Sequence, residues 1–144
     1  MIAISPYIVA IVTAWVVAQG LKYIVGSLKS HSFKKSFRQL YLSGNMPSAH
    51  SATVVALLVL IGWKQGIGSA IFGLALLFSA IVMYDAVMVR RSSGEQGKAI
   101  TEMILATKSK VDLPRVAKGH TPIEVLAGAL VGSIVGFIVI LATS

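Results

Sequence analysis

Four long apolar stretches constrain this chain more than any other feature of its sequence. They cover residues 6–28, 47–63, 67–89 and 122–142, and few charged residues interrupt them. About 20 apolar residues are enough to cross a lipid bilayer as a helix, which satisfies its own backbone hydrogen bonds. The pattern therefore predicts an all-α protein, an integral membrane helical bundle with about four transmembrane helices.

The composition supports this fold class. Of the 144 residues, 56% are hydrophobic and only 12% are charged, whereas soluble domains carry about 25% charged residues. These values exclude a disordered chain, a disulfide scaffold and an ordinary soluble enzyme. No internal repeat divides the chain, so we expect residues 1–144 to form a single transmembrane domain.

The net charge of +8 is expected to reflect membrane topology and not nucleic-acid binding. Basic residues collect in the cytoplasmic loops of membrane proteins. Here they cluster at residues 26–46 and 90–120, while the turn between the second and third stretches has only Lys64. Four spans then put both long loops in the cytoplasm and both termini outside. Residues 94–108 are predicted to form a short helix along the membrane surface, with an ordinary connector as the alternative.

Three glycines, Gly128, Gly132 and Gly136, lie four residues apart in the last apolar stretch. Glycines at this spacing form a flat groove that another helix can approach closely. The groove can serve packing against the other helices of the same chain, or it can be the seam of a homodimer. The sequence leaves both interpretations open.

The four-span topology also brings four groups of polar residues to one face of the membrane. Two of these groups precede the second and fourth spans, and each contains a histidine next to a helix N-terminus. Helix N-termini and cationic side chains together suit a phosphate ligand. The four groups contain Gln19 and Lys22; Ser48 and His50; Asp85, Arg90 and Arg91; and His120 and Glu124.

These residue types allow phosphoryl-transfer chemistry, and they also have structural explanations. One histidine can attack phosphorus while the other protonates the leaving oxygen, and a carboxylate can orient the first histidine. On the structural side, Thr121 and Glu124 fit a helix capping box, and Ser48 fits a helix start. The structural explanation for Asp85 is an ion pair with Lys22, Arg90 or Arg91.

Three motifs resemble those of the type 2 phosphatidic acid phosphatase superfamily, which includes lipid phosphatases, bacterial acid phosphatases and vanadium haloperoxidases. Pro47-Ser48-Ala49-His50 is similar to the Pro-Ser-Gly-His motif of that superfamily. The chain looks most like its divergent branch of small bacterial and plastid membrane proteins. That branch shows Gly-Met-Pro-Ser-x-His-Ser, Tyr-Asp-Ala-x-x-Val-Arg-Arg and Gly-His-Thr-Pro-x-Glu, which correspond here to residues 45–51, 84–91 and 119–124.

The resemblance implies a role for each matching residue. His120 would be the nucleophile that forms a phosphohistidine, Glu124 would orient it, and His50 would be the general acid. Asp85 would support the site. The superfamily needs no metal ion for hydrolysis, so no cofactor is expected. The usual Lys-x6-Arg-Pro motif is absent, and the residues expected to hold phosphate oxygens are Ser48, Arg90, Arg91, Lys22 and Arg38.

We therefore expect a lipid phosphatase of a bacterial cytoplasmic membrane, with its active-site loops in the cytoplasm. Its expected substrate is a phospholipid or polyprenyl phosphate, a monoester or diphosphate. Phosphatidylglycerophosphate is preferred over phosphatidic acid and polyprenyl diphosphate. One alternative is a catalytically silent membrane protein that binds anionic lipid head groups or assembles partners through the same basic face. A haloperoxidase-like vanadate site is a further alternative.

Overall fold

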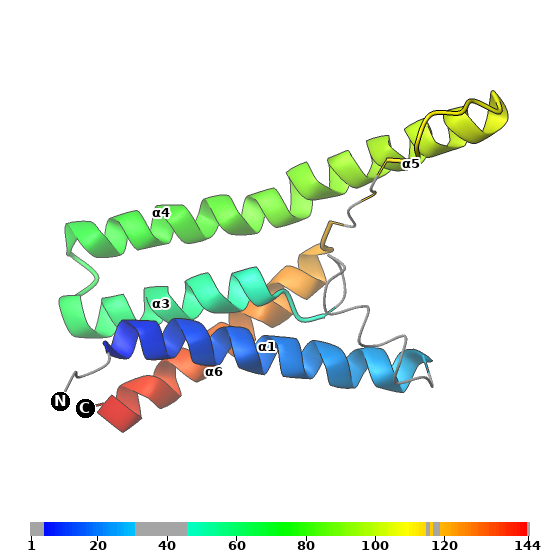
Figure 1. Ribbon diagram of the computed structural model, residues 1–144. Helices are drawn as coiled ribbons and strands as arrows, with labels where there is room; N and C mark the ends of the chain where they lie inside the picture. Colours follow the sequence, from blue (N-terminus) through cyan, green and yellow to red (C-terminus); the bar gives the residue numbers. More distant parts are fainter. Residues whose placement is uncertain (1–4, 31–45, 115, 117–118, 144) are drawn as a thin grey trace.

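The computed structural model describes residues 5–30, 46–114, 116 and 119–143, and these residues form the helical bundle that the sequence predicts (Figure 1). Three helical stretches are long and apolar enough to cross a membrane, namely Pro6–Leu28, Ala70–Ala106 and Pro122–Thr143, and a further apolar helix is shorter. In chain order the elements are α1 (Pro6–Ser30), α3 (Ala49–Gln65), α4 (Ala70–Tyr84), the π-helical turn η1 (Asp85–Val89), α5 (Arg90–Ala106) and α6 (Pro122–Thr143).

Serine side chains start two of the helices. The Ser48 hydroxyl accepts a hydrogen bond from the Ser51 N–H at 3.4 Å and caps α3. Ser69 caps α4 in the same way through the Phe72 N–H at 3.2 Å. Such side chains satisfy N–H groups that have no partner within the helix. Helix α3 ends at Gln65 and is followed by Gly66, whose φ of 84° suits glycine best, and the chain then turns into α4.

Helix α3 lies at the centre of the bundle, because α1, α4 and α6 all pack against it. Helices in lipid gain little from the hydrophobic effect, so close packing of small residues supplies much of their attraction. The main core cluster follows this rule, with alanines of α1 and α3 facing branched side chains. It consists of Ala10, Ala14, Ala56, Leu60, Val135, Val139 and Ile140.

The three glycines of α6 face α3 of the same chain and are all buried. A Cβ atom added at Gly132 would collide with the backbone carbonyl of Ala52, and one added at Gly128 would collide with that of Ser48. The chain therefore uses this face for internal packing. Helix α3 already covers the surface that a homodimer seam at the glycines would need.

Helix α4 is held on one side only. Ser79 is the only buried residue in α4, and its hydroxyl reaches the carbonyl oxygens of Val54 in α3, at 3.3 Å, and of Ala75, at 2.8 Å. The remaining faces of α4 expose large apolar side chains such as Leu74 and Phe78. In a membrane these side chains contact lipid.

Helix α4 continues through η1 into α5 as one helical rod of 37 residues, Ala70–Ala106 (Figure 1). At 1.5 Å per residue its length is about 55 Å, whereas the hydrocarbon core of a bilayer is about 30 Å thick. The helix predicted at residues 94–108 is thus present at Arg90–Ala106, but it extends α4 instead of following a connector. The reason is that backbone hydrogen bonding continues through η1 into Arg90, where the change to charged residues suggested a break.

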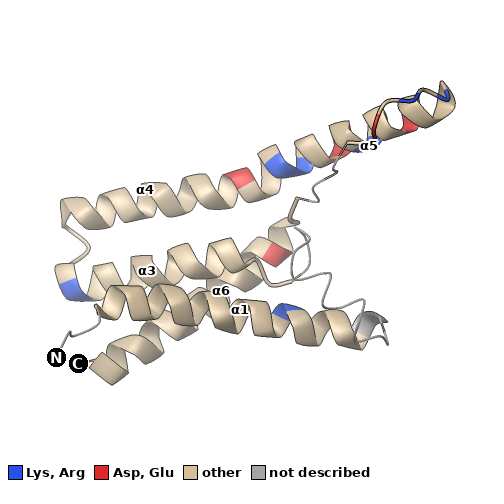
Figure 2. Ribbon diagram, viewed as in Figure 1, with Lys and Arg blue, Asp and Glu red and all other residues tan. Residues whose placement is uncertain are grey.

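The two ends of the bundle differ in charge. The first turn of α1 and the last turn of α6 lie at the end where α3 turns into α4 (Figure 1). Figure 2 shows that charged residues gather toward the opposite end and along α5, apart from Lys64 in the last turn of α3. This arrangement agrees with the four-span topology, and which end faces the cytoplasm stays a prediction.

Candidate active site

Two backbone hydrogen bonds join α3, α6 and η1 at the charged end of the bundle. The Ser48 N–H, at the start of α3, donates to the Glu124 carbonyl oxygen in α6 at 3.0 Å. The His120 N–H, just before α6, donates to the Ala86 carbonyl oxygen in η1 at 3.0 Å. Residues that are far apart in the sequence therefore share one site, which is the convergence expected from the topology.

The π-helical turn explains why Ala86 can accept the bond from His120. In an α-helix the Arg90 N–H would bond to the Ala86 carbonyl oxygen, four residues back. In η1 this N–H bonds to the Asp85 carbonyl oxygen, five residues back. The Ala86 carbonyl then accepts the N–H of His120. Single π-helical turns are frequent at functional sites.

Gly119 allows the segment before α6 to approach the rod closely. A Cβ atom at this position would collide with the backbone nitrogen and Cα of Arg91. Because these are backbone atoms of a helix and not the end of a flexible side chain, they can shift only at a high cost in free energy. Gly119 thereby sets the position of the adjacent His120.

Three hydrogen bonds connect His120, Thr121 and Glu124 to one another. Glu124 Oε2 lies 3.1 Å from His120 Nδ1 and accepts from the Thr121 N–H at 3.0 Å, while the Thr121 hydroxyl accepts from the Glu124 N–H at 3.4 Å. Glu124 therefore closes a capping box and also contacts the imidazole. Because a carboxylate only accepts hydrogen bonds, the ring proton lies on Nδ1 and the Nε2 lone pair of a neutral ring is left available.

Burial governs the charge of His120, which is only 4% exposed. Desolvation lowers the pKa of His120 below its ordinary value, and the positive charges of Lys22 and Arg90 lower it further. The hydrogen bond and the negative charge of Glu124 raise the pKa, but the net shift is downward. The ring is therefore neutral at pH 7, which is the form that can act as a nucleophile.

Two cationic side chains lie near this imidazole. Lys22 of α1 is only 6% exposed and interacts electrostatically with Glu124. Arg90 donates from Nε to Asp85 Oδ2 at 2.7 Å. The sequence left three candidate partners open for Asp85, and the structure selects Arg90.

The second histidine, His50, lies in the first turn of α3 and is exposed, unlike His120. It is within electrostatic reach of His120 and of Lys22, Asp85 and Arg90. The structure thus brings together both histidines, two carboxylates and two cations from α1, α3, η1, α5 and the start of α6.

Two other residues predicted to hold phosphate, Ser48 and Arg91, are engaged in contacts elsewhere. The Ser48 hydroxyl is fully buried and accepts a bond from the Ser51 hydroxyl at 3.0 Å, in addition to capping α3. Arg91 donates from Nε to Glu95 Oε1 at 3.2 Å on the exposed surface of α5. Arg38 lies outside the described residues.

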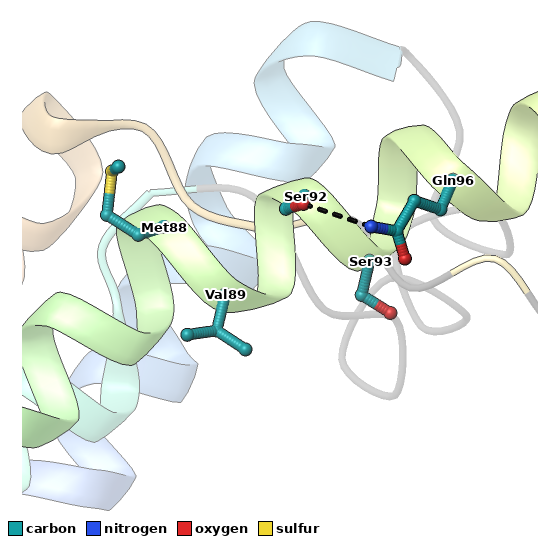
Figure 3. A pocket seen from close by; sticks show the side chains of 5 residues that line it. All are labelled: Met88, Val89, Ser92, Ser93 and Gln96. Carbon is teal, nitrogen blue, oxygen red and sulfur yellow. Dashed lines mark hydrogen bonds between the residues drawn. The ribbon is translucent and has the colours of Figure 1, made fainter.

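A shallow surface pocket of about 410 Å³ lies beside η1 and α5, and none of the residues predicted for phosphate chemistry lines it. Gln96 donates to the Ser92 hydroxyl at 3.4 Å in its wall (Figure 3). Within the part of the chain that the structure describes, no group of three or more His, Cys, Asp or Glu side chains is arranged to hold a metal ion. We therefore place the candidate site at His120 and not in this pocket, whose lining residues are Met88, Val89, Ser92, Ser93 and Gln96.

Two parts of the site were not predicted from the sequence. They are the Ala86 carbonyl that holds the backbone of His120 and the backbone contact between Gly119 and Arg91. Alanine and glycine carry no reactive group, so a search for reactive side chains passes over them. The available signal was their position inside the motifs at residues 84–91 and 119–124.

Comparisons with known proteins agree with the membrane fold. The model of the divergent PAP2 family matches residues 4–135. The chain is 33% identical over 138 residues to the "uncharacterized membrane protein YuiD" of Bacillus subtilis (strain 168), an alignment that covers 85% of this chain and 84% of the relative. No solved structure matches the chain significantly.

Proposed function

The chain belongs to the divergent PAP2 family, and from this premise we propose that it is a membrane phosphatase that hydrolyses a lipid phosphate monoester or diphosphate through a phosphohistidine. The observation that carries the proposal is the partly buried contact between His120 Nδ1 and Glu124 Oε2 at 3.1 Å. This contact holds the ring as a nucleophilic histidine requires, with Nε2 available for attack.

The reaction proceeds in two balanced steps. In the first step His120 Nε2 attacks phosphorus, the bond between phosphorus and the lipid oxygen breaks, and protonated His50 gives its proton to that oxygen. In the second step water attacks the phosphohistidine, His50 accepts a proton from the water, and the phosphorus–nitrogen bond breaks to release inorganic phosphate. The carboxylate of Glu124 stabilises the positive charge that His120 carries in the intermediate.

Lys22 and Arg90 supply positive charge for the phosphate oxygens. Both lie within electrostatic reach of the two histidines, and Asp85 holds Arg90 through the bond at 2.7 Å. The first turn of α3, which contains His50, adds backbone N–H groups, because a helix start leaves such groups without partners in the helix. In this proposal Arg90, and not Arg91, is the arginine that binds phosphate.

Phosphatidylglycerophosphate is the substrate that we propose first, followed by phosphatidic acid and polyprenyl diphosphate. This order rests on the predicted cytoplasmic location of the charged end, where a lipid made on that leaflet reaches the site. The alternative function is binding of anionic lipid head groups without turnover. It is favoured by the engagement of the Ser48 hydroxyl in a helix cap and of Arg91 with Glu95, since both remove potential phosphate ligands.

Phosphate release by the purified protein in detergent tests the proposal. The panel contains phosphatidylglycerophosphate, phosphatidic acid and undecaprenyl diphosphate, each with EDTA present. We expect turnover of one lipid, with a loss of at least about a hundredfold in His120→Ala and His50→Ala. Lys98→Ala, which removes an exposed cation of α5, is the control and should match the wild type. Folded wild-type protein that releases no phosphate from any of the three lipids would instead support the silent lipid-binding function.

A further inference from the structure

A cavity lies among the apolar helices, away from the charged end. Its volume of about 300 Å³ is at the lower limit for ligand pockets. Two of the residues that line the cavity are polar, Tyr7 and Gln65. They pair with each other, because Gln65 donates a hydrogen bond to the Tyr7 hydroxyl at 2.9 Å. We call it the tail cavity, and its walls come from α1, α3 and α4 through Tyr7, Leu57, Ile61, Gln65 and Ile71.

The tail cavity lies on the same face of α3 as His50. Leu57 and Ile61 follow His50 by seven and eleven residues, which are two and three helical turns. Helices α1 and α4 both pack against α3, and both contribute to the walls of the cavity. His50 and the near wall of the tail cavity therefore share one face of α3, and α4 packs on this face between them through the bond of the Ser79 hydroxyl to the Val54 carbonyl oxygen.

The near wall of the cavity lies at the depth of one leaflet of a bilayer, and Gln65, in the last turn of α3, lies at its far end. At 1.5 Å per residue, Leu57 and Ile61 lie about 10 and 16 Å from His50 along the helix axis. The hydrocarbon core is about 30 Å thick, so one leaflet provides about 15 Å of tail. The end of a lipid tail that runs along this face from a phosphate at His50 thus lies beside Leu57 and Ile61.

The distribution of charge along this face selects an anionic lipid. Lys22 and Arg90 are at the end that carries His50, where they complement a negatively charged head group. Below this end the lining of the cavity is hydrocarbon, apart from the Tyr7 and Gln65 pair at the far end. A cationic end and an apolar cavity on the same helix face complement a molecule with an anionic head and a hydrocarbon tail.

We propose that the tail cavity binds the end of one hydrocarbon tail of the lipid phosphate whose head group lies at His50, and that it thereby selects substrates by tail length. The identity of the head group rests on the proposed function. The tail site itself rests on the cavity, on its position along α3 and on its depth.

Photocrosslinking tests the tail site without requiring turnover. The full-length protein is placed in phosphatidylcholine vesicles that contain phosphatidic acid with a diazirine at the end of one tail, and the adducts are located by peptide mass spectrometry after illumination. We expect adducts at Leu57, Ile61 and Ile71. Excess unlabelled phosphatidic acid should suppress them, whereas additional phosphatidylcholine should not.

Substitutions in the cavity provide the matched comparison. Leu57→Trp fills the cavity, and Leu74→Trp places the same side chain on the exposed outer face of α4. We expect Leu57→Trp to lose the adducts and to raise KM for long-tailed phosphatidic acid by about tenfold, the loss expected when a few methylene groups are no longer buried. Hydrolysis of a short-tailed analogue should stay at the wild-type rate, and Leu74→Trp should change none of these quantities.

The outcomes separate the two proposals. Adducts spread over the outer faces of α4 and α6, unchanged by competitor or by Leu57→Trp, overturn the tail site even if lipid phosphates are hydrolysed. Adducts in the cavity without any release of phosphate retain the tail site and overturn the proposed hydrolysis. Ile71→Trp, at the half-exposed rim of the cavity, provides the same comparison if Leu57→Trp does not fold.

Discussion

A single oxygen atom, Oε2 of Glu124, accepts from the Thr121 N–H at 3.0 Å and lies 3.1 Å from His120 Nδ1. The start of α6 and the orientation of the imidazole therefore depend on the same atom. The sequence suggested a capping box and an orienting carboxylate as alternatives, and the structure contains both contacts. To test the two roles separately, a substitution at Glu124 must keep the hydrogen bond to the Thr121 N–H and remove the negative charge beside His120.

Glu124→Gln is that variant, because glutamine also closes a capping box but carries no negative charge. We expect kcat to fall about a hundred- to ten-thousandfold, with a melting temperature close to that of the wild type. In the wild type, burial lowers the His120 pKa, so activity should rise with pH along an acid limb below pH 6.5. Glu124 raises this pKa, so its loss should move the acid limb to still lower pH.

The pH profile of kcat/KM for the hydrolysed lipid, measured for both proteins, checks this expectation. A variant with wild-type kcat and an unchanged acid limb would show that Glu124 serves only as a helix cap.

At the residue scale the sequence predicted the titratable members of the site and missed its backbone. His120, His50 and Glu124 could be found because their side chains have distinctive chemistry and stand beside helix starts. The Ala86 carbonyl could not be found in this way, because its availability depends on a π-helical turn. Such turns are rare, and nothing in the spacing of residues 85–89 marks one.

At the scale of elements, the sequence predicted the four apolar helices, and it placed the end of the third one too early. The sequence Arg90-Arg91-Ser92-Ser93-Gly94 reads as the end of a span, since charged residues and weak helix formers follow an apolar stretch. The helix nevertheless continues to Ala106. Val116 packs against Gly97, so the returning chain lies against α5 and supports it, and local propensity does not decide the outcome.

The glycine face of α6 leads to a prediction about stability. Gly132→Ala puts a Cβ atom against the Ala52 carbonyl of α3, and we expect a loss of about 1–3 kcal/mol from overpacking. Gly20→Ala in α1 is the matched control, since no atom lies within 4 Å of its added Cβ, and its stability should be unchanged or slightly higher.

Thermal melting followed by circular dichroism in detergent measures both variants. Equal melting temperatures for Gly132→Ala and the wild type would contradict the close approach of α6 to α3.

At the scale of the whole molecule, the count of basic residues predicts the orientation of the bundle. The turn between α3 and α4 should face the outside, and the charged end should face the cytoplasm. The chain contains no cysteine, so single cysteines can be placed without removing native ones. Gln65 and Ser109 are both exposed, and they lie before this turn and after α5.

In intact cells we expect a membrane-impermeant maleimide to label Gln65→Cys. Ser109→Cys should react only after the cells are made permeable. Labelling of both positions from the same side would rule out the four-span topology. If Ser109→Cys reacts in intact cells and Gln65→Cys reacts only after permeabilisation, the orientation is the reverse of the predicted one.

The one-sided attachment of α4 has a mechanical consequence. Among the helices of the bundle, α4 packs on α3, with Ser79 as its only buried residue, and the rod that it begins carries the carbonyl that fixes the backbone of His120. The rod is therefore held to the bundle near Ser79, and the backbone of His120 is bonded to it at Ala86. A helix whose apolar stretch exceeds the thickness of the bilayer core can tilt, and a change of tilt about this contact would displace the Ala86 carbonyl and the His120 N–H bonded to it. We therefore expect the position of the His120 backbone to change with the thickness of the surrounding lipid.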